Sequence, residues 1–174
     1  MTALDRVLPD AEPSTAGWRR RLVDLAIVAT PLAIGGASSV LTMDGLRVWY
    51  RTIERPDWNP PDWVFGPVWT TLYLMMGIAL VQVVRSDRDR IARWAGIGLF
   101  ALQLGLNFGW SWIFFTNHDL GGALIEILGL WLAIAATIAA FAQVRRSAAA
   151  LLVPYLAWTT FATVLTATIW RLNR

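Results

Sequence analysis

Five apolar segments, each about twenty residues long, limit how this chain can fold more than any other feature; they are residues 22–43, 63–84, 94–115, 122–143 and 148–170. A helix rises 1.5 Å per residue, so about 20 residues cross the ~30 Å hydrocarbon core of a bilayer. Only a helix satisfies the backbone of a single segment in lipid. The hydrophobic content of 56% and the mean hydropathy of +0.50 agree. We therefore predict an all-α, multi-pass integral membrane protein, a bundle of five transmembrane helices.

The stretches between these segments divide the chain. Residues 1–21 are polar and end in Arg19–Arg21, so we predict an N-terminal polar tail followed by a transmembrane domain over 22–174. We expect no cleaved signal peptide, because the first apolar run is long and ends without a clear small-residue cleavage pattern. The short joins at 116–121 and 144–147 require antiparallel neighbouring helices.

The connection at 44–62 is longer than a helix hairpin needs. Its prolines Pro56, Pro60 and Pro61 stiffen the backbone, and Asn59 followed by Pro60 is typical of a helix start. Loops of this length are usually functional lids or disordered. The loop carries bulky aromatic residues, so we predict a packed lid over a pocket; these are Trp49, Tyr50, Trp58 and, at its edge, Trp63.

The distribution of charge predicts an orientation. All fifteen basic residues are arginine, and five crossings place ten of them on the side of the N-terminus: Arg6, Arg19, Arg20, Arg21, Arg85, Arg88, Arg90, Arg93, Arg145 and Arg146. The positive-inside rule then puts the N-terminus in the cytoplasm and the long loop outside, in a bacterial cell membrane. The net charge of +3 lies in these loops, so we expect the lipid bilayer as a partner and no nucleic acid.

Aromatic residues within the segments indicate a pocket. Trp69 and Tyr73 share one helix face well inside the membrane, where a tryptophan of the interfacial belt would not lie. Trp58 and Trp63 fit either the belt or the pocket. In the last segment Tyr155, Trp158, Ala162 and Thr166 share a face, which forms an aromatic-walled slot or packs in the core. A chain with eleven tryptophans suits a flat apolar ligand.

The third segment carries two stripes. Gln103, Asn107 and Ser111 recur every four residues and should face the interior, where they either join helices or, for Asn107 above all, orient a ligand. A stripe of small residues on the other side predicts close helix contact, within the fold or across a homodimer; it comprises Ala101, Gly105 and Gly109. Glu126 is the single acidic residue well inside a span, and it is either functional or reaches the surface.

Several kinds of chemistry lack the residues they need. The chain has no cysteine and one histidine, His118, so we expect no metal site and no cofactor. A Ser-His-Asp set and a Gly-rich phosphate loop are absent, so no catalytic residues are assigned.

Four stretches together carry a resemblance: WY at 49–50, RPDWNPPDWVFGPVWTTLY at 55–73, QLGLNFGWSWIFF at 103–115 and PYLAWTTFAT at 154–163. In order and spacing the chain resembles the TspO/MBR family of tryptophan-rich sensory proteins and translocator proteins over roughly residues 25–173. The resemblance implies a five-helix bundle, commonly a homodimer, with a pocket closed by the first loop. It implies a ligand-binding set at Tyr50, Pro60, Trp69, Asn107, Trp158 and Ala162, and a dimer interface at Ala101, Gly105 and Gly109.

The function that the resemblance implies is a receptor or sensor that binds a porphyrin such as protoporphyrin IX and modulates tetrapyrrole handling or a stress response. One alternative is an enzyme that degrades porphyrin in light, with Trp69 and Trp158 supplying electrons; another is a porphyrin or sterol transporter. After the FAT run this chain has Thr166–Thr168 before Trp170 and lacks the tyrosine of the sterol-recognition pattern. We therefore do not expect cholesterol to bind through that motif.

Overall fold

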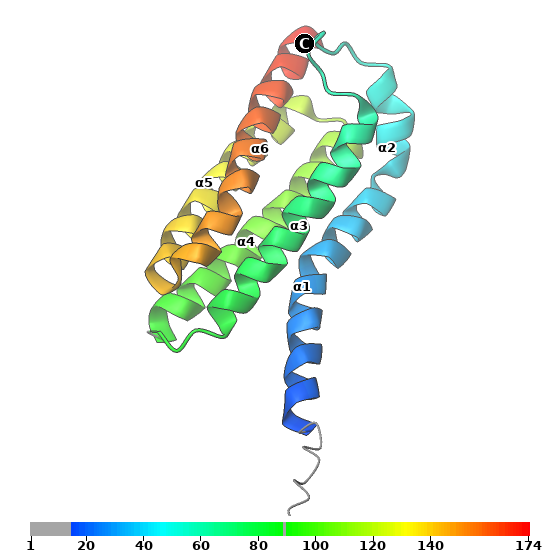
Figure 1. The fold of residues 1–174 in the computed structure, drawn as a ribbon. Coiled ribbons are helices and arrows are strands. Elements are labelled where there is room, and N and C mark those ends of the chain that lie inside the picture. Colours follow the sequence, from blue (N-terminus) through cyan, green and yellow to red (C-terminus); the bar gives the residue numbers. More distant parts are fainter. Residues whose placement is uncertain (1–14, 89) are drawn as a thin grey trace, which may run out of the picture.

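The computed structural model describes residues 15–88 and 90–174, which form helices joined by short turns (Figure 1). Their order is α1 (Thr15–Leu41), α2 (Met43–Arg47), η1 (Trp49–Arg51), α3 (Asp62–Val84), α4 (Arg90–Phe115), α5 (Leu120–Val144) and α6 (Arg146–Leu172). Five helices of the described residues are long and apolar enough to cross a membrane. The predicted all-α fold with five transmembrane helices is confirmed.

The first helix differs most from its predicted bounds. It begins at Thr15, so Arg19–Arg21 lie in its first turns and not in a tail. The helix continues beyond the apolar run because arginine is a good helix former and keeps its charge outside the hydrocarbon. Arg85, just after α3, holds this end: its Nε donates to Asp24 Oδ1 at 2.8 Å, and its Nη2 donates to the Arg20 carbonyl at 3.1 Å. The rest of the predicted tail, 1–14, lies outside the described residues.

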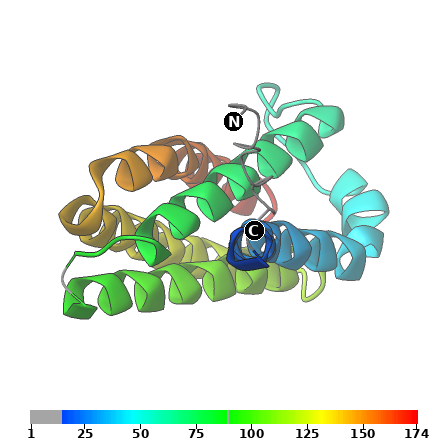
Figure 2. The ribbon, with the colours of Figure 1, turned by 60° about the horizontal axis from the view of Figure 1, so that its bottom comes forward.

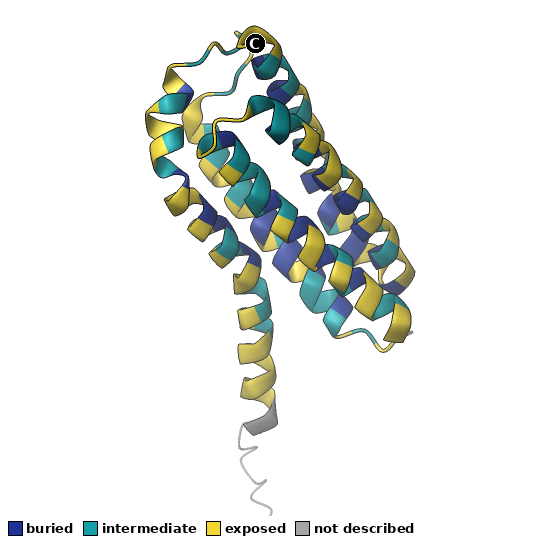
Figure 3. Cartoon of the chain, turned by 180° about the vertical axis from the view of Figure 1, so that it is seen from behind, coloured by how far each residue is buried: buried dark blue, intermediate teal, exposed yellow. Residues whose placement is uncertain are grey.

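Helices α3 to α6 form the packed part of the bundle. They bury Met76, Ile134, Phe141 and Tyr155 almost completely. Figure 3 shows the buried residues on the faces that these helices turn toward one another, whereas the N-terminal half of α1 is largely exposed. In Figure 2, α1 lies beside α3 and α4 and away from α5 and α6, in agreement with its contacts. Helix α1 is thus a lateral wall added to a four-helix core.

Glycines allow the closest approaches of α1 and α2 to this core. A Cβ at Gly77 of α3 would lie 2.6 Å from the Val28 carbonyl oxygen of α1, so backbone meets backbone there. A Cβ at Gly35 of α1 would collide with the Tyr73 ring, and one at Gly45 of α2 with the Phe115 carbonyl. A side chain at any of these positions would push the wall outward.

The predicted helix start at Asn59–Pro60 is wrong. Helix α3 begins at Asp62 and is preceded by Pro61 with φ −57° and ψ 142°. The residue before a proline is driven out of the helical region, so Pro60, which precedes Pro61, cannot open the helix. Asn59 uses its side chain within the loop instead. Helix α2 and η1 give the first half of this loop a regular structure that the sequence did not predict.

Candidate functional site

A cavity of about 480 Å³ lies between α1, α3, α4 and α6, and Leu46 of α2 and Tyr50 of η1 close its outer end. Its volume falls within the range of ~300–1,000 Å³ that is usual for small-molecule sites. Four of the six predicted binding residues line it: Tyr50, Trp69, Trp158 and Ala162.

Aromatic rings form two walls of this cavity. On α3, Trp69 stacks on Tyr73 with ring centres 5.3 Å apart and planes 27° apart. On α6, Trp158 meets the edge of Phe65 at 5.9 Å and lies 5.3 Å from Phe161. Both half-buried indoles therefore line the cavity, and each is held by a neighbouring ring. Such a pair of walls suits a flat, conjugated guest.

The contribution of α1 to the site was not predicted. Leu32, Gly35, Ser38 and Ser39 of this helix line the cavity, as does Thr42 directly after it. The run GGASS at 35–39 is the signal that could have shown it, because consecutive small residues leave space beside a helix. The hydroxyls of Ser39 and Thr42 donate to carbonyls one turn earlier in α1, at 2.9 and 2.8 Å. The wall that α1 contributes is consequently made mostly of small side chains, and its hydroxyls are largely occupied by hydrogen bonds within the helix.

Asn107 does not line the cavity. It is buried on α4, and the Tyr73 hydroxyl donates to its Oδ1 at 2.7 Å. Asn107 therefore orients the ring on which Trp69 stacks. Gln103, one turn away, is also buried as expected of the polar stripe, but its amide has no hydrogen-bond partner among the described residues. Ser111 does line the cavity.

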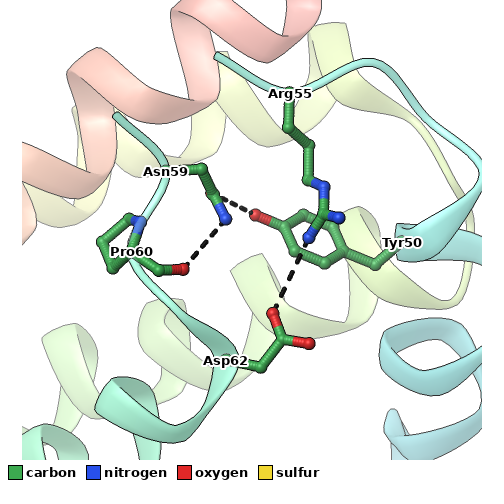
Figure 4. A network of polar contacts seen from close by, with 5 residues as sticks. All are labelled: Tyr50, Arg55, Asn59, Pro60 and Asp62. Carbon is green, nitrogen blue, oxygen red and sulfur yellow. Dashed lines mark hydrogen bonds and ion pairs between the residues drawn. The ribbon is translucent and has the colours of Figure 1, made fainter. Parts of the chain in front are cut away.

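The lid is fastened at several points. Tyr50 is buried and its hydroxyl donates to Asn59 Oδ1 at 2.8 Å, while Asn59 Nδ2 donates to the carbonyl of Pro60 at 3.0 Å (Figure 4). Pro60 therefore belongs to the lid and does not line the cavity. The backbone of Glu54 exchanges two hydrogen bonds with the Asn173 side chain, at 2.9 and 2.8 Å.

An aromatic contact also holds the lid to the turn between α4 and α5. Trp49 stacks on His118, with ring centres 4.3 Å apart and planes 13° apart. The single histidine thus packs against the lid. Among residues 15–88 and 90–174, no group of three histidine or acidic side chains is arranged to hold a metal ion.

We expect Tyr50→Phe to loosen the lid by about 1 kcal/mol, because it keeps the ring and removes the hydrogen bond to Asn59. Burial raises the pKa of the Tyr50 hydroxyl above its ordinary value, with Arg55 partly opposing the shift. The neutral hydroxyl is therefore favoured in the closed lid, and its stabilisation is complete below about pH 10 and lost as the pH rises through the raised pKa.

Hydrogen exchange of the backbone amides at 52–59 measures this effect, with the amides of α5 as the internal control. Exchange at pH 7 should be faster in Tyr50→Phe than in the unmodified protein, and only the unmodified lid should loosen further above pH 10. Equal protection of the lid in both proteins would contradict the role given to this hydrogen bond.

The stripe of small residues on α4 is open to the outside of the single chain. Ala101 and Gly105 are exposed, and a Cβ at Gly105 would meet no atom within 4 Å. Gly109 is covered by Glu126 of α5, whose Oε1 would lie 3.5 Å from a Cβ there. Glu126 is half-buried and outside the cavity, and its Oε2 has no hydrogen-bond partner among the described residues.

The cavity walls carry few titratable groups. They are Tyr50, Tyr73 and, at the outer end, Asp62. Neither tyrosine hydroxyl is paired with a base: each donates to an asparagine amide oxygen. The described residues that line the cavity are therefore mostly apolar, and they include no acid–base pair of the kind that hydrolysis needs.

Comparison with known proteins gives one consistent result. Residues 27–171 match the model of the TspO/MBR family. The tryptophan-rich protein TspO of Chlorobaculum tepidum is 43% identical over 155 residues, which cover 88% of this chain and 98% of that protein. The human translocator protein is 44% identical over 131 residues, 75% of this chain and 77% of its own length. The tryptophan-rich sensory protein of Cereibacter sphaeroides is 36% identical over 156 residues, with coverage of 90% and 92%.

Proposed function

Because this chain belongs to the TspO/MBR family, we propose that it is a membrane receptor or sensor that holds a porphyrin, such as protoporphyrin IX, in the cavity below the lid. Binding of the porphyrin would then modulate tetrapyrrole handling or a stress response. The observation that carries this proposal is the placement of Trp69 and Trp158 on the walls of one cavity.

The shape and chemistry of the cavity support a porphyrin over smaller or more polar ligands. Its volume of about 480 Å³ suits a molecule of drug size or larger. Indole and phenol rings offer flat apolar faces, and offset stacking on them adds ~0.5–1.5 kcal/mol per ring pair beyond the burial of area. A few polar side chains, among them Thr42 and Asp62, interrupt the mostly apolar lining. A macrocycle with polar edge groups fits such a lining.

Titration of the purified protein with protoporphyrin IX in nanodiscs of neutral lipid tests the proposal. The Soret band of the porphyrin should shift, and tryptophan fluorescence should fall, with saturation at one porphyrin per chain. A linear, unsaturated response equal to that of empty nanodiscs would show partition into lipid and would rule the binding role out.

Light-dependent degradation of the bound porphyrin is a second candidate, favoured by the stack of Trp69 on Tyr73. Two oxidisable rings in contact at the cavity wall offer a route for electrons between a photo-excited ligand and the protein interior. The titrated sample, illuminated in air, should then lose the Soret band and gain a bilin-like product faster than the same porphyrin in empty nanodiscs. Equal rates with and without protein would rule the degradation role out.

We propose further that two copies pair through the open stripe of α4. Small residues let helices approach closely in lipid; Ala101 and Gly105 are exposed, and a Cβ at Gly105 meets no atom within 4 Å. Gly105→Leu should convert a dimer into a monomer, as seen by light scattering in detergent. Gly129→Leu on α5, which is equally open, is the matched control. Identical masses for the two variants would place the contact elsewhere.

The position of the lid supports an orientation in the membrane. The hydrogen bonds between Glu54 and Asn173 place the lid and the C-terminus at the same end of the bundle. The arginine excess lies at the opposite end, in the N-terminal residues and the turns that follow α3 and α5. We infer that the N-terminus faces the cytoplasm of a bacterial cell and that the lid lies outside.

A further inference from the structure

A second, shallow hollow lies among the residues of the lid and the start of α3. Its volume is about 550 Å³, and its lining is Ile53, Arg55, Pro56, Asn59, Pro60, Pro61 and Asp62. Asp62 lines both this hollow and the cavity in the membrane. The two spaces therefore meet at the first residue of α3, one of them apolar and the other polar.

Arg55 is the cation at this junction (Figure 4). Its guanidinium lies over the Tyr50 ring, 5.1 Å from the ring centre, and its Nη1 is 3.7 Å from Asp62 Oδ1. That separation is longer than a hydrogen bond, and the two side chains are 31% and 55% exposed. Such a pair contributes little to stability.

Asp62 has a favourable interaction that does not involve Arg55. It lies in the first turn of α3, where the helix dipole favours an anion. The guanidinium can therefore turn from Asp62 to another acceptor without leaving a buried, unpaired carboxylate behind. Among the residues that line the two spaces, Arg55 is the one basic side chain.

We propose that the cavity and the outer hollow form one site for an amphiphile, in which Arg55 binds an acidic group of the ligand. The flat apolar body occupies the cavity between the tryptophans, and a carboxylate at its edge reaches past Asp62 to the guanidinium. A planar guanidinium donates two parallel hydrogen bonds to a carboxylate, a geometry that an ammonium cannot match. This inference rests on the proposed function and narrows its ligand to carboxylated, planar molecules.

The negative charge of Asp62 makes the role of Arg55 stronger. Asp62 repels an incoming carboxylate, so an anion binds at the junction only while the Arg55 guanidinium is present. Removing the guanidinium would leave the ligand carboxylate beside Asp62 without a counter-ion. Removing the charge of Asp62 should have the opposite effect on the same ligand.

The test compares protoporphyrin IX with its dimethyl ester, which has the same ring and no carboxylate. Both are titrated in nanodiscs of phosphatidylcholine against the unmodified protein, Arg55→Gln and Arg51→Gln. Arg51 is exposed on η1 and lines neither space, so it is the matched control. We expect Arg55→Gln to weaken the diacid about tenfold, the loss of one hydrogen-bonded charge contact, and to leave the ester unchanged.

Two further variants sharpen the result. Arg55→Lys should recover only part of the diacid affinity, and Asp62→Asn should bind the diacid more tightly with the ester unchanged. Equal weakening of the diacid and the ester by Arg55→Gln would show that Arg55 only holds the lid. An unchanged affinity for the diacid would show that Arg55 does not contact the ligand. Either result overturns the inference and leaves the proposed porphyrin binding intact. Failure of the unmodified protein to bind either porphyrin would instead remove the proposed function.

Discussion

Trp158→Ala should weaken porphyrin binding about thirtyfold. The indole forms the α6 wall of the cavity, and its removal deletes both the stacking surface and the ring that packs against Phe65 and Phe161. Central aromatic residues of this kind commonly contribute 2 kcal/mol or more to binding, and each 1.4 kcal/mol changes affinity tenfold. The cavity also becomes wider, so a flat guest is no longer enclosed on two sides.

The shift of the porphyrin Soret band measures this affinity without relying on the remaining tryptophans. Trp94→Ala is the control, because Trp94 lies near the opposite end of α4, is 57% exposed and does not line the cavity. It should bind porphyrin as tightly as the unmodified protein. Equal affinities for Trp158→Ala and Trp94→Ala would place the ligand outside the cavity.

Gly77→Ala should lower the free energy of unfolding by about 1–3 kcal/mol, although it adds a single methyl group. That methyl would lie 2.6 Å from the Val28 carbonyl oxygen, and backbone cannot move aside as a flexible side chain would. Helix α1 must then shift away from α3. Because α1 is also a wall of the cavity, porphyrin affinity should fall together with the melting temperature.

Gly66→Ala is the matched control on the same helix, since a Cβ there meets no atom within 4 Å. Replacing a helical glycine by alanine is otherwise favourable by ~0.5–1 kcal/mol, so this variant should melt at the same or a slightly higher temperature. Thermal unfolding of both variants in detergent, followed by near-ultraviolet circular dichroism, gives the comparison. If Gly77→Ala melts with Gly66→Ala, the contact between α1 and α3 is looser than these distances require.

The membrane-spanning helices were predictable because the bilayer imposes one length on each of them. Helices α3 to α6 begin and end within four residues of the predicted segments. The start of α1 was missed, because the hydropathy of a segment marks where lipid ends and not where helical hydrogen bonding ends. The Asn59–Pro60 pattern failed for a local reason that the sequence did contain, the second proline at position 61.

The candidate site was predictable in part. Helical periodicity put Trp158 and Ala162 on one helix face and Trp69 on another, and these residues line two walls of the cavity, since a repeat of three or four residues defines a helix face. It did not say which neighbour each face meets. Asn107 therefore binds the Tyr73 hydroxyl and stays outside the cavity, although its face was predicted correctly.

By its length and apolarity, the sequence alone determined that this chain crosses a membrane five times and which helix faces carry aromatic and small residues. Only the tertiary structure decided that α1 supplies a wall of the cavity, through contacts at Gly35 and Gly77, and that Arg55 and Asp62 stand where the cavity meets the outer hollow. The physical reason is that hydrophobic periodicity acts within one helix, whereas a cavity is the space left between several. Its shape depends on contacts between residues far apart in the chain, which no local pattern records.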